Sequence, residues 1–384
     1  MFEVYTLFYF ILLYTNLTVD VVAPSLLIIV SAFREFYLII VFLYFLLSIT
    51  QRKTIFFTAE NVLLTICIIL AVPYILISGN KGCAISTFLV YYSGPLLFLF
   101  ITNIKFSSIS IKNYSYFLRK LLLLLCIGSL VLFPFQNTIV DIFGEKRFKL
   151  FYLTDGSMKM RLFGLGFHPT TTGFLCIYTA SMFFIINKKI IPTSICLFTQ
   201  NLAHTRSALF GIPVYILFRI KSKLVKILFV ILGIVGSICI FFAFTHNYLN
   251  KYIDFSAMVH FLHLFVDGPE AVIKYAQGIG LGMVSPYNLD NPLLHLESDF
   301  YLYAIQVGIH NLIFFLIAIC FIIRKLVKQK NVKANYLLFI FSTFLMGCIF
   351  FPLHSMRFIS NFVWIELGFY FSDLNFANKR SIQL

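Results

Sequence analysis

Charged side chains are scarce in this chain. Asp, Glu, Lys and Arg make up 12% of its 384 residues, hydrophobic residues make up 60%, and the mean hydropathy is +0.93. A core formed by a chain of this length cannot hide so much apolar surface from water. This composition excludes a soluble globular protein and predicts an integral membrane protein.

Closely spaced cysteines are also lacking. The eight cysteines fall singly, which excludes a disulfide framework and the ligand spacing of a metal site. His260 and His263 lie three residues apart but have no third ligand beside them, so we expect no metal and no cofactor. Period-two alternation is missing as well, which excludes a β-barrel and favours helices as the spanning elements.

Long apolar runs separated by short polar breaks are what the sequence does contain. They predict an all-α polytopic membrane protein of one domain, residues 1–384, with about 12 transmembrane helices (11–13). The first run carries Asp20 and Pro24 and is either one segment or two; we interpret it as a retained span rather than a signal peptide. The expected spans are 4–31, 36–49, 61–78, 84–101, 116–133, 163–186, 190–203, 207–220, 224–244, 300–323, 336–351 and 358–372.

Basic residues collect in every second connection between these runs. By the positive-inside rule this predicts that the N- and C-termini are cytoplasmic and that the net charge of +15 reflects insertion topology, not nucleic-acid binding. The other connections then face outward, including a turn around Arg34 and a long loop over 245–299. We expect the first half of that loop to form a helix along the membrane surface, and "DGPE" (267–270) and "GIGLG" (278–282) to bend the chain.

Several cations lie on the outer side against this insertion bias. Their convergence on one rim predicts a bound anion, and arginine suits a diphosphate because its planar fork forms paired charge-assisted hydrogen bonds. Alternatively, Arg34 forms a solvated pair with Glu35, and Arg357 and His354 anchor lipid headgroups. The set comprises Arg34, Arg161, Arg206 and Arg357, accompanied by His168, His204, His295 and His354.

The outer hairpin "HTR" (204–206) has short arms of about 13 apolar residues, or roughly 20 Å at 1.5 Å per residue, against about 30 Å of hydrocarbon. If the basic ends stay at the cytoplasmic surface, His204 and Arg206 lie below the outer surface. Buried charge and irregular backbone require a wet or protein-lined cavity at that depth.

Three ionisable residues, His295, Glu297 and Asp299, precede the run that continues to Ile323. An extended approach would turn all three to one face, whereas an earlier helix start would leave only His295 and Asp299 together. We assign helix capping to Asp299, which also faces the cation-rich rim, and we keep Glu297 and His295 as candidate general bases.

The order of three motifs resembles a known family. "RLFGLGFHPTTTGF" opens a span, "LAHTRSALFG" forms the outer hairpin, and "GIGLG" with "ESDFYLYAIQVGIHNLIFFL" closes the long loop. In the order of these motifs the chain is similar to the bacterial O-antigen polymerases, the Wzy class, which are related to the O-antigen ligases. The likeness covers residues 120–325 at motif level and the whole chain in layout.

This resemblance implies a metal-independent glycosyltransferase at the periplasmic face of the inner membrane. Such an enzyme transfers a growing glycan from undecaprenyl diphosphate to an incoming lipid-linked repeat of O-antigen or capsule. A chain-length regulator is a further expected partner, besides membrane lipid. The absence of an Asp-x-Asp motif fits, because the donor is not a nucleotide sugar and arginine can stabilise the leaving diphosphate.

Glu297, His295, Arg206 and Arg161 are the expected catalytic residues under this resemblance. Arg34, His168, His204, Asp299, His354 and Arg357 are the expected substrate-binding residues.

One difference from the related ligases helps to distinguish a polymerase from a ligase. Ligases of this superfamily carry a His-Asn pair eleven residues before the glycine of the closing span, and that register here holds Glu297 and Ser298, counted from Gly308. This favours the polymerase over the ligase. A flippase for the same lipid-linked oligosaccharide is the second alternative, although no inverted repeat is visible. A membrane scaffold without chemistry is the third.

Overall fold

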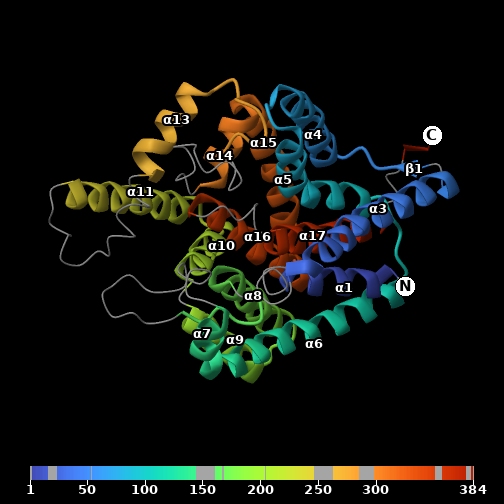
Figure 1. Cartoon of the computed structure of the whole chain (residues 1–384). Coiled ribbons are helices and arrows are strands. Elements are labelled where there is room, and N and C mark those ends of the chain that lie inside the picture. The colour runs from blue at the N-terminus through green and yellow to red at the C-terminus, as the bar shows by residue number, and fades with distance from the viewer. Residues whose placement is uncertain are drawn as a thin grey trace.

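The computed structural model describes residues 2–15, 24–52, 54–143, 161–166, 168–203, 205–245, 263–284, 298–350, 357–377 and 382–383. Over these residues the chain is almost entirely helical, as predicted (Figure 1). The exception is a short antiparallel pair, β1 (Thr54–Ile55) with β2 (Ile382–Gln383). The α-helices are α1 (Phe2–Tyr14), α3 (Leu27–Arg52), α4 (Ala59–Ile77), α5 (Lys81–Ile101), α6 (Ser108–Leu132), α7 (Gln136–Phe143), α8 (Pro169–Ser181), α9 (Ile190–Ala203), α10 (Gly211–Arg219), α11 (Lys223–Thr245), α13 (Gly268–Lys274), α14 (Asp299–Val307), α15 (Ile309–Lys328), α16 (Val332–Phe350) and α17 (Arg357–Ala377).

Shorter 3-10 and π-helical segments extend or join several of these helices. They are η1 (Pro24–Leu26), η2 (Phe133–Phe135), η5 (Met182–Ile186), η6 (Arg206–Phe210) and η7 (His263–Asp267).

Within the described residues, seven helices are long and apolar enough to cross a bilayer, which confirms an α-helical membrane protein. Three apolar helices, including α9 and α10, are shorter. The full count of twelve spans stays a prediction. The seven are Ile29–Gln51, Ala59–Ile77, Lys81–Ile101, Ile109–Ile142, Pro169–Ile186, Ile309–Lys328 and Val332–Ile349.

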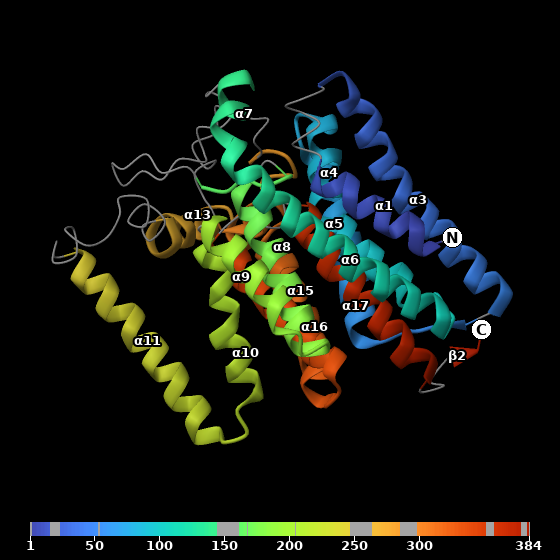
Figure 2. The same ribbon diagram turned by 90° about the horizontal axis from the view of Figure 1, so that it is seen from below.

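The helices run side by side between two ends of the molecule (Figure 2). Both described extremities of the chain lie at one end, because β1 pairs with β2 and the ring of Phe2 lies 5.2 Å from that of Phe106. We call this the terminal end. The opposite, distal end carries the connection between α4 and α5, the turn between α9 and η6, and the starts of α8, α14 and α17.

Helix α17 forms the centre of the bundle, with almost every residue from Arg357 to Ser372 buried. It packs against α5, where the Trp364 indole covers Gly94 so closely that a Cβ there would lie 2.3 Å from Trp364 Cδ1. Some polar groups on this buried face pair across the two helices: Ser93 Oγ donates to Asn361 Oδ1 at 3.0 Å. Pairing of this kind lets a central helix carry polar residues without leaving them unsatisfied.

The first predicted span, 4–31, and the predicted turn around Arg34 are wrong. α1 ends at Tyr14, and η1 and α3 form one continuous helical stretch from Pro24 to Arg52. Arg34 therefore lies inside a helix, about 10 Å along it from Leu27 at 1.5 Å per residue. The charge interrupts the apolar pattern without ending the helix because Glu35 pairs with it.

The predicted break at "DGPE" is also wrong, since these residues lie in the helical stretch formed by η7 and α13. Pro269 falls in the first turn of α13, a position that needs no backbone N–H donor and suits the fixed φ of proline. The proline therefore starts a helix instead of interrupting one. The surface helix was expected over 248–265; its last three residues belong to η7, and 248–262 lie outside the described residues.

The predicted span over 300–323 is not one helix, because the chain breaks at Gly308 (φ +83°) between α14 and α15. The glycine loop 278–282 docks against this break. Backbone N–H groups of Ile279 and Gly280 donate to the carbonyls of Ile305 and Gln306 at 2.9 and 3.1 Å. Those carbonyls would otherwise accept hydrogen bonds from a continuing helix, so the loop replaces the helical pattern. The loop itself forms the predicted bend.

Candidate functional site

Two of the predicted arginines, Arg34 of α3 and Arg357 of α17, meet at the distal end around one carboxylate. Arg34 donates from Nε and Nη2 to Glu35 Oε1 at 3.2 and 3.1 Å, and Arg357 Nη1 donates to the same oxygen. The three residues carry two positive charges and one negative charge. Two guanidinium groups held this close together favour the binding of an anion beside them.

Arg357 is the more buried of the two, with 8% of its side chain exposed. Its Nη2 donates to the Ser86 carbonyl at 3.5 Å, while its Nε is buried and has no hydrogen-bond partner among the described residues. One turn along α17, Asn361 donates to the Tyr9 hydroxyl at 2.6 Å. A buried guanidinium with an unused donor is costly without an acceptor. The surroundings of Arg357 therefore favour the binding of an oxyanion that accepts a hydrogen bond from it.

Arg161 lies in an irregular segment, 161–166, that covers the turn between α9 and η6. Its Nε donates to the Ala203 carbonyl at 3.0 Å, and Leu162 N donates to the Leu202 carbonyl at 2.9 Å. Gln136 of α7 holds the segment from the other side, accepting from Phe163 N at 2.9 Å. These bonds fix Arg161 next to the turn that leads to Arg206.

The hairpin formed by α9 and α10 has the short arms that the sequence predicts, 14 and 9 residues. Its turn is buried: Thr205 is 2% exposed and donates to the Pro169 carbonyl at 3.1 Å. Arg206 follows directly as the first residue of η6, and only its backbone is described. Arg161 and the backbone of Arg206 thus lie at the same end of the bundle, on opposite sides of one turn.

His168 is the N-cap of α8. Its Nδ1 accepts from the Thr171 backbone N–H at 3.4 Å, which leaves the ring hydrogen on Nε2. Burial lowers the pKa of His168 to about 4, and the positive charge of Arg161 adds to this effect. The imidazole is therefore neutral near pH 7 and adds no positive charge to the site.

Tyr14, at the end of α1, links the surroundings of the two arginine groups. Its hydroxyl lies 3.1 Å from both Ser129 Oγ and Thr172 Oγ1, and its ring lies 5.2 Å from Phe358, which follows Arg357. Thr172 belongs to the first turn of α8, which His168 caps. The Arg34 and Arg357 pair and the Arg161 and His168 pair therefore border one region of the distal end.

Asp299 is fully buried in the first turn of α14, where a carboxylate favourably meets the helix N-terminus. The capping position itself belongs to Ser298, so the assignment of the cap to Asp299 is wrong by one residue. Ser298 Oγ instead donates to the Cys348 carbonyl of α16 at 3.4 Å. The remaining predicted site residues lie outside the described residues: His204, His295, Glu297 and His354.

No protein-family model matches the sequence, and no curated protein matches it. The geometry of the site therefore carries the functional argument.

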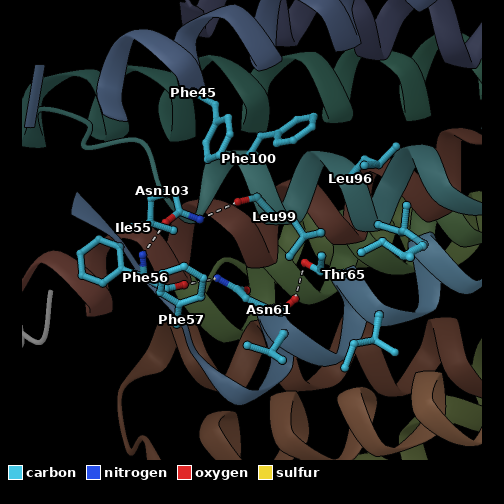
Figure 3. Close-up of a pocket in the computed structure, with 14 residues that line it drawn as sticks. Phe45, Ile55, Phe56, Phe57, Asn61, Thr65, Leu96, Leu99, Phe100 and Asn103 are labelled. Atoms are coloured by element: carbon cyan, nitrogen blue, oxygen red, sulfur yellow. Dashed lines mark hydrogen bonds between the residues drawn. The ribbon is translucent and has the colours of Figure 1, made fainter. Parts of the chain in front are cut away.

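A cavity of about 470 Å³ lies between α3, α4 and α5, toward the terminal end (Figure 3). No charged side chain lines it. Most of its polar groups bond to the protein: Asn103 Oδ1 accepts from Phe56 N at 2.8 Å, and Thr65 donates to the Asn61 carbonyl at 2.8 Å, while Asn61 Oδ1 has no partner among the described residues. This cavity suits an apolar chain and does not suit a diphosphate.

Metal-assisted chemistry was not predicted, and the described residues contain no group of three or more His, Cys, Asp or Glu side chains placed to hold a metal ion. The cysteines whose side chains are described are free thiols. Cys126 and Cys176 lie close together in the core, with their sulfur atoms 3.6 Å apart.

This region also contains Tyr9, Asn361 and Tyr14, which were not predicted from the sequence. Asn361 carries a usable signal, because it follows Arg357 by four residues and shares its helix face. Tyr9 and Tyr14 carry none. Their roles depend on how α1 packs against α17 and α8, which one sequence does not reveal.

Proposed function

We propose that this chain is a polymerase of O-antigen or capsular repeat units that uses polyprenyl-diphosphate-linked glycans. The distal end would face the periplasm and the terminal end the cytoplasm. The reaction transfers the growing glycan from undecaprenyl diphosphate to a hydroxyl of an incoming lipid-linked repeat.

One observation carries the proposal. Arg357 is buried beside Arg34, the two share a single carboxylate, and Arg357 Nε is left without a partner among the described residues. Neighbouring guanidinium groups match a doubly or triply charged diphosphate better than a neutral sugar. Arg161, fixed by the Ala203 carbonyl, supplies a third guanidinium at the same end.

In the proposed reaction the anomeric C–O bond to the diphosphate breaks as the acceptor oxygen forms the new glycosidic bond. The acceptor proton passes to a general base, for which Glu297 and His295 are the candidates. Negative charge grows on the leaving diphosphate, and the arginines stabilise it there. One undecaprenyl diphosphate is released for each bond formed.

The banding pattern of surface polysaccharide in a strain that lacks this protein tests the proposal against its alternatives. Loss of a polymerase leaves lipid A core bearing a single repeat. Loss of a ligase would leave bare core, and loss of a flippase would trap lipid-linked repeats on the inner face. Long ladders that survive deletion would contradict the polymerase and the ligase together.

A further inference from the structure

A second cavity, which has charged residues in its lining, lies at the terminal end between α6, η5, α16 and α17. It has a volume of about 270 Å³. This volume equals that of about nine water molecules at roughly 30 Å³ each, which admits a small headgroup but not a glycan or a nucleotide. Its polar lining includes Lys112, Tyr114, Arg119, Lys333, Tyr336 and Glu366.

Glu366 is a buried acid in the wall of this cavity, 6% exposed. The Tyr114 hydroxyl donates to its Oε1 at 2.6 Å, and this is the hydrogen bond that the carboxylate makes within the described residues. A buried carboxylate with one donor gains from further donors, so a cationic group in the cavity would be stabilised beside it.

Tyr336 provides a second, independent observation that favours a bound polar group. Its side chain is 1% exposed, and its hydroxyl has no hydrogen-bond partner among the described residues. Buried hydroxyl groups in folded proteins are usually satisfied. A polar group of a bound molecule would satisfy this one.

Cations surround the more open side of the cavity. Lys112 is exposed, and Arg119 and Lys333 are half-buried. Arg119 Nη1 donates to Asn187 Oδ1 at 3.0 Å, and Lys333 Nζ lies 3.8 Å from Asp373 Oδ2, which leaves Lys112 without an ion-pair partner within the described part of the chain. The cavity therefore presents an acid deep inside and cations near its opening.

We propose that this cavity binds the headgroup of a phospholipid with a primary amine, such as phosphatidylethanolamine. The ammonium would donate to Glu366 Oε2, while the phosphate would lie against Lys112 and Arg119 and accept from the Tyr336 hydroxyl. Both charges of the zwitterion then meet a complementary partner. A lipid is favoured over a free phosphate ester because the cavity lies where apolar helices end among basic residues, as in other headgroup sites between membrane helices.

Native mass spectrometry of the purified full chain tests this assignment, with phosphatidylethanolamine, phosphatidylcholine, phosphatidylglycerol and soluble phosphoethanolamine added separately. We expect phosphatidylethanolamine to reach half-occupancy at a concentration at least about tenfold lower than phosphatidylcholine, whose methylated amine cannot donate to a carboxylate. Equal binding of these two lipids by the unmodified protein would overturn the proposal. Equal binding of soluble phosphoethanolamine would overturn its assignment to a lipid.

Two variants test the recognition of the ammonium group and of the phosphate group separately. Glu366→Gln keeps an acceptor for Tyr114 but removes the negative charge, and it should abolish the preference for phosphatidylethanolamine over phosphatidylcholine while leaving phosphatidylglycerol bound. Arg119→Gln should weaken all three phospholipids several-fold. An unchanged preference in folded Glu366→Gln protein would refute ammonium recognition.

Discussion

Arg357 is the residue whose surroundings most restrict what the distal end can bind. It is buried, it shares Glu35 with Arg34, and its Nε has no partner among the described residues. Lysine would keep the charge but lose the planar fork that binds two phosphate oxygens at once. We therefore expect the geometry of the guanidinium to matter, not only its charge.

Arg357→Lys should reduce polymerisation by about 10- to 100-fold, the loss expected when one charge-assisted hydrogen bond of about 1.5–3 kcal/mol is removed. Arg161→Lys and Arg206→Lys should act in the same direction. The measurement is the length of polysaccharide ladders at matched protein levels in the membrane. Arg324→Lys, an exposed position near the terminal end, is the matched control and should leave the ladders unchanged. Normal ladders in all three distal variants would favour a scaffold.

Glu35→Gln should destabilise the packing of α3 against α17, because two neighbouring guanidinium groups would lose their shared counter-charge. Since the Glu35 side chain is 32% exposed, we expect a moderate loss of about 1–2 kcal/mol. Thermal unfolding in detergent measures it, and added pyrophosphate should raise the midpoint of the variant more than that of the wild type. Glu270→Gln, at an exposed carboxylate, is the control. A variant as stable as the wild type would mean that Glu35 does not hold the cluster together.

His168 should make stability depend on pH in a defined direction. Its pKa in the folded protein is about 4, below the value of about 6.5 expected in the unfolded chain. The unfolded state therefore binds the proton first, and the stability contributed by the neutral ring is present above pH 6.5 and is lost as the pH falls toward 4.

The variant His168→Asn keeps a good helix N-cap but does not titrate. The midpoint of thermal unfolding should fall less between pH 6.5 and 4 for this variant than for the wild type. Parallel curves would show that His168 is not the titrating group.

At the scale of elements, the docking of the glycine loop 278–282 onto the break between α14 and α15 depends on backbone shape. Gly278 has φ +86°, and a Cβ there would lie 2.7 Å from Gly308 N and 2.5 Å from the Tyr74 ring. Gly278→Ala should cost about 2–4 kcal/mol through backbone strain and overpacking. Gly79→Ala, where a Cβ would meet nothing within 4 Å, should be close to neutral. Thermal unfolding of the two variants provides the comparison, and equal midpoints would contradict the proposed role of the loop.

Apolar runs predicted most helices because lipid-facing and core-facing positions both require apolar residues, so a spanning helix needs no amphipathic pattern. The prediction failed at positions where a contact with residues distant in the sequence decides whether the helix continues. Arg34 did not end its helix, because Glu35, which also pairs with the distant Arg357, compensates its charge. Gly308 did interrupt a helix, because the loop 278–282 donates to the carbonyls of Ile305 and Gln306, which a continuing helix would otherwise use.

For the site, the sequence could indicate which arginines are unusual but not which of them meet. Glu35 and Arg357 are separated by 322 positions in the chain. Their contact depends on the packing of α3 and α17 against α1 and α5, and short motifs contain no information about it. The burial of Thr205 beneath the segment 161–166 follows more directly, because the short arms of the α9 and α10 hairpin already predicted a recessed turn.

At the scale of the whole molecule, the two ends of the bundle differ in chemistry. The distal end holds arginines around Glu35 and the buried turn at Thr205, whereas the terminal end holds the cavity around Glu366. A polymerase that takes both substrates from one leaflet needs its reaction site at one end only. Anchoring by a phospholipid at the other end is compatible with that arrangement.

The central claim, that distal arginines bind and stabilise a leaving diphosphate during glycan transfer, is tested most directly with purified protein in lipid nanodiscs. Supplied with undecaprenyl-diphosphate-linked repeats and no added metal, the wild type should form glycan ladders. It should also release one undecaprenyl diphosphate per new glycosidic bond, and Arg357→Lys should do so about 10- to 100-fold more slowly. Absence of both polymer and released undecaprenyl diphosphate in the wild type, or an unchanged rate in Arg357→Lys, would contradict the account.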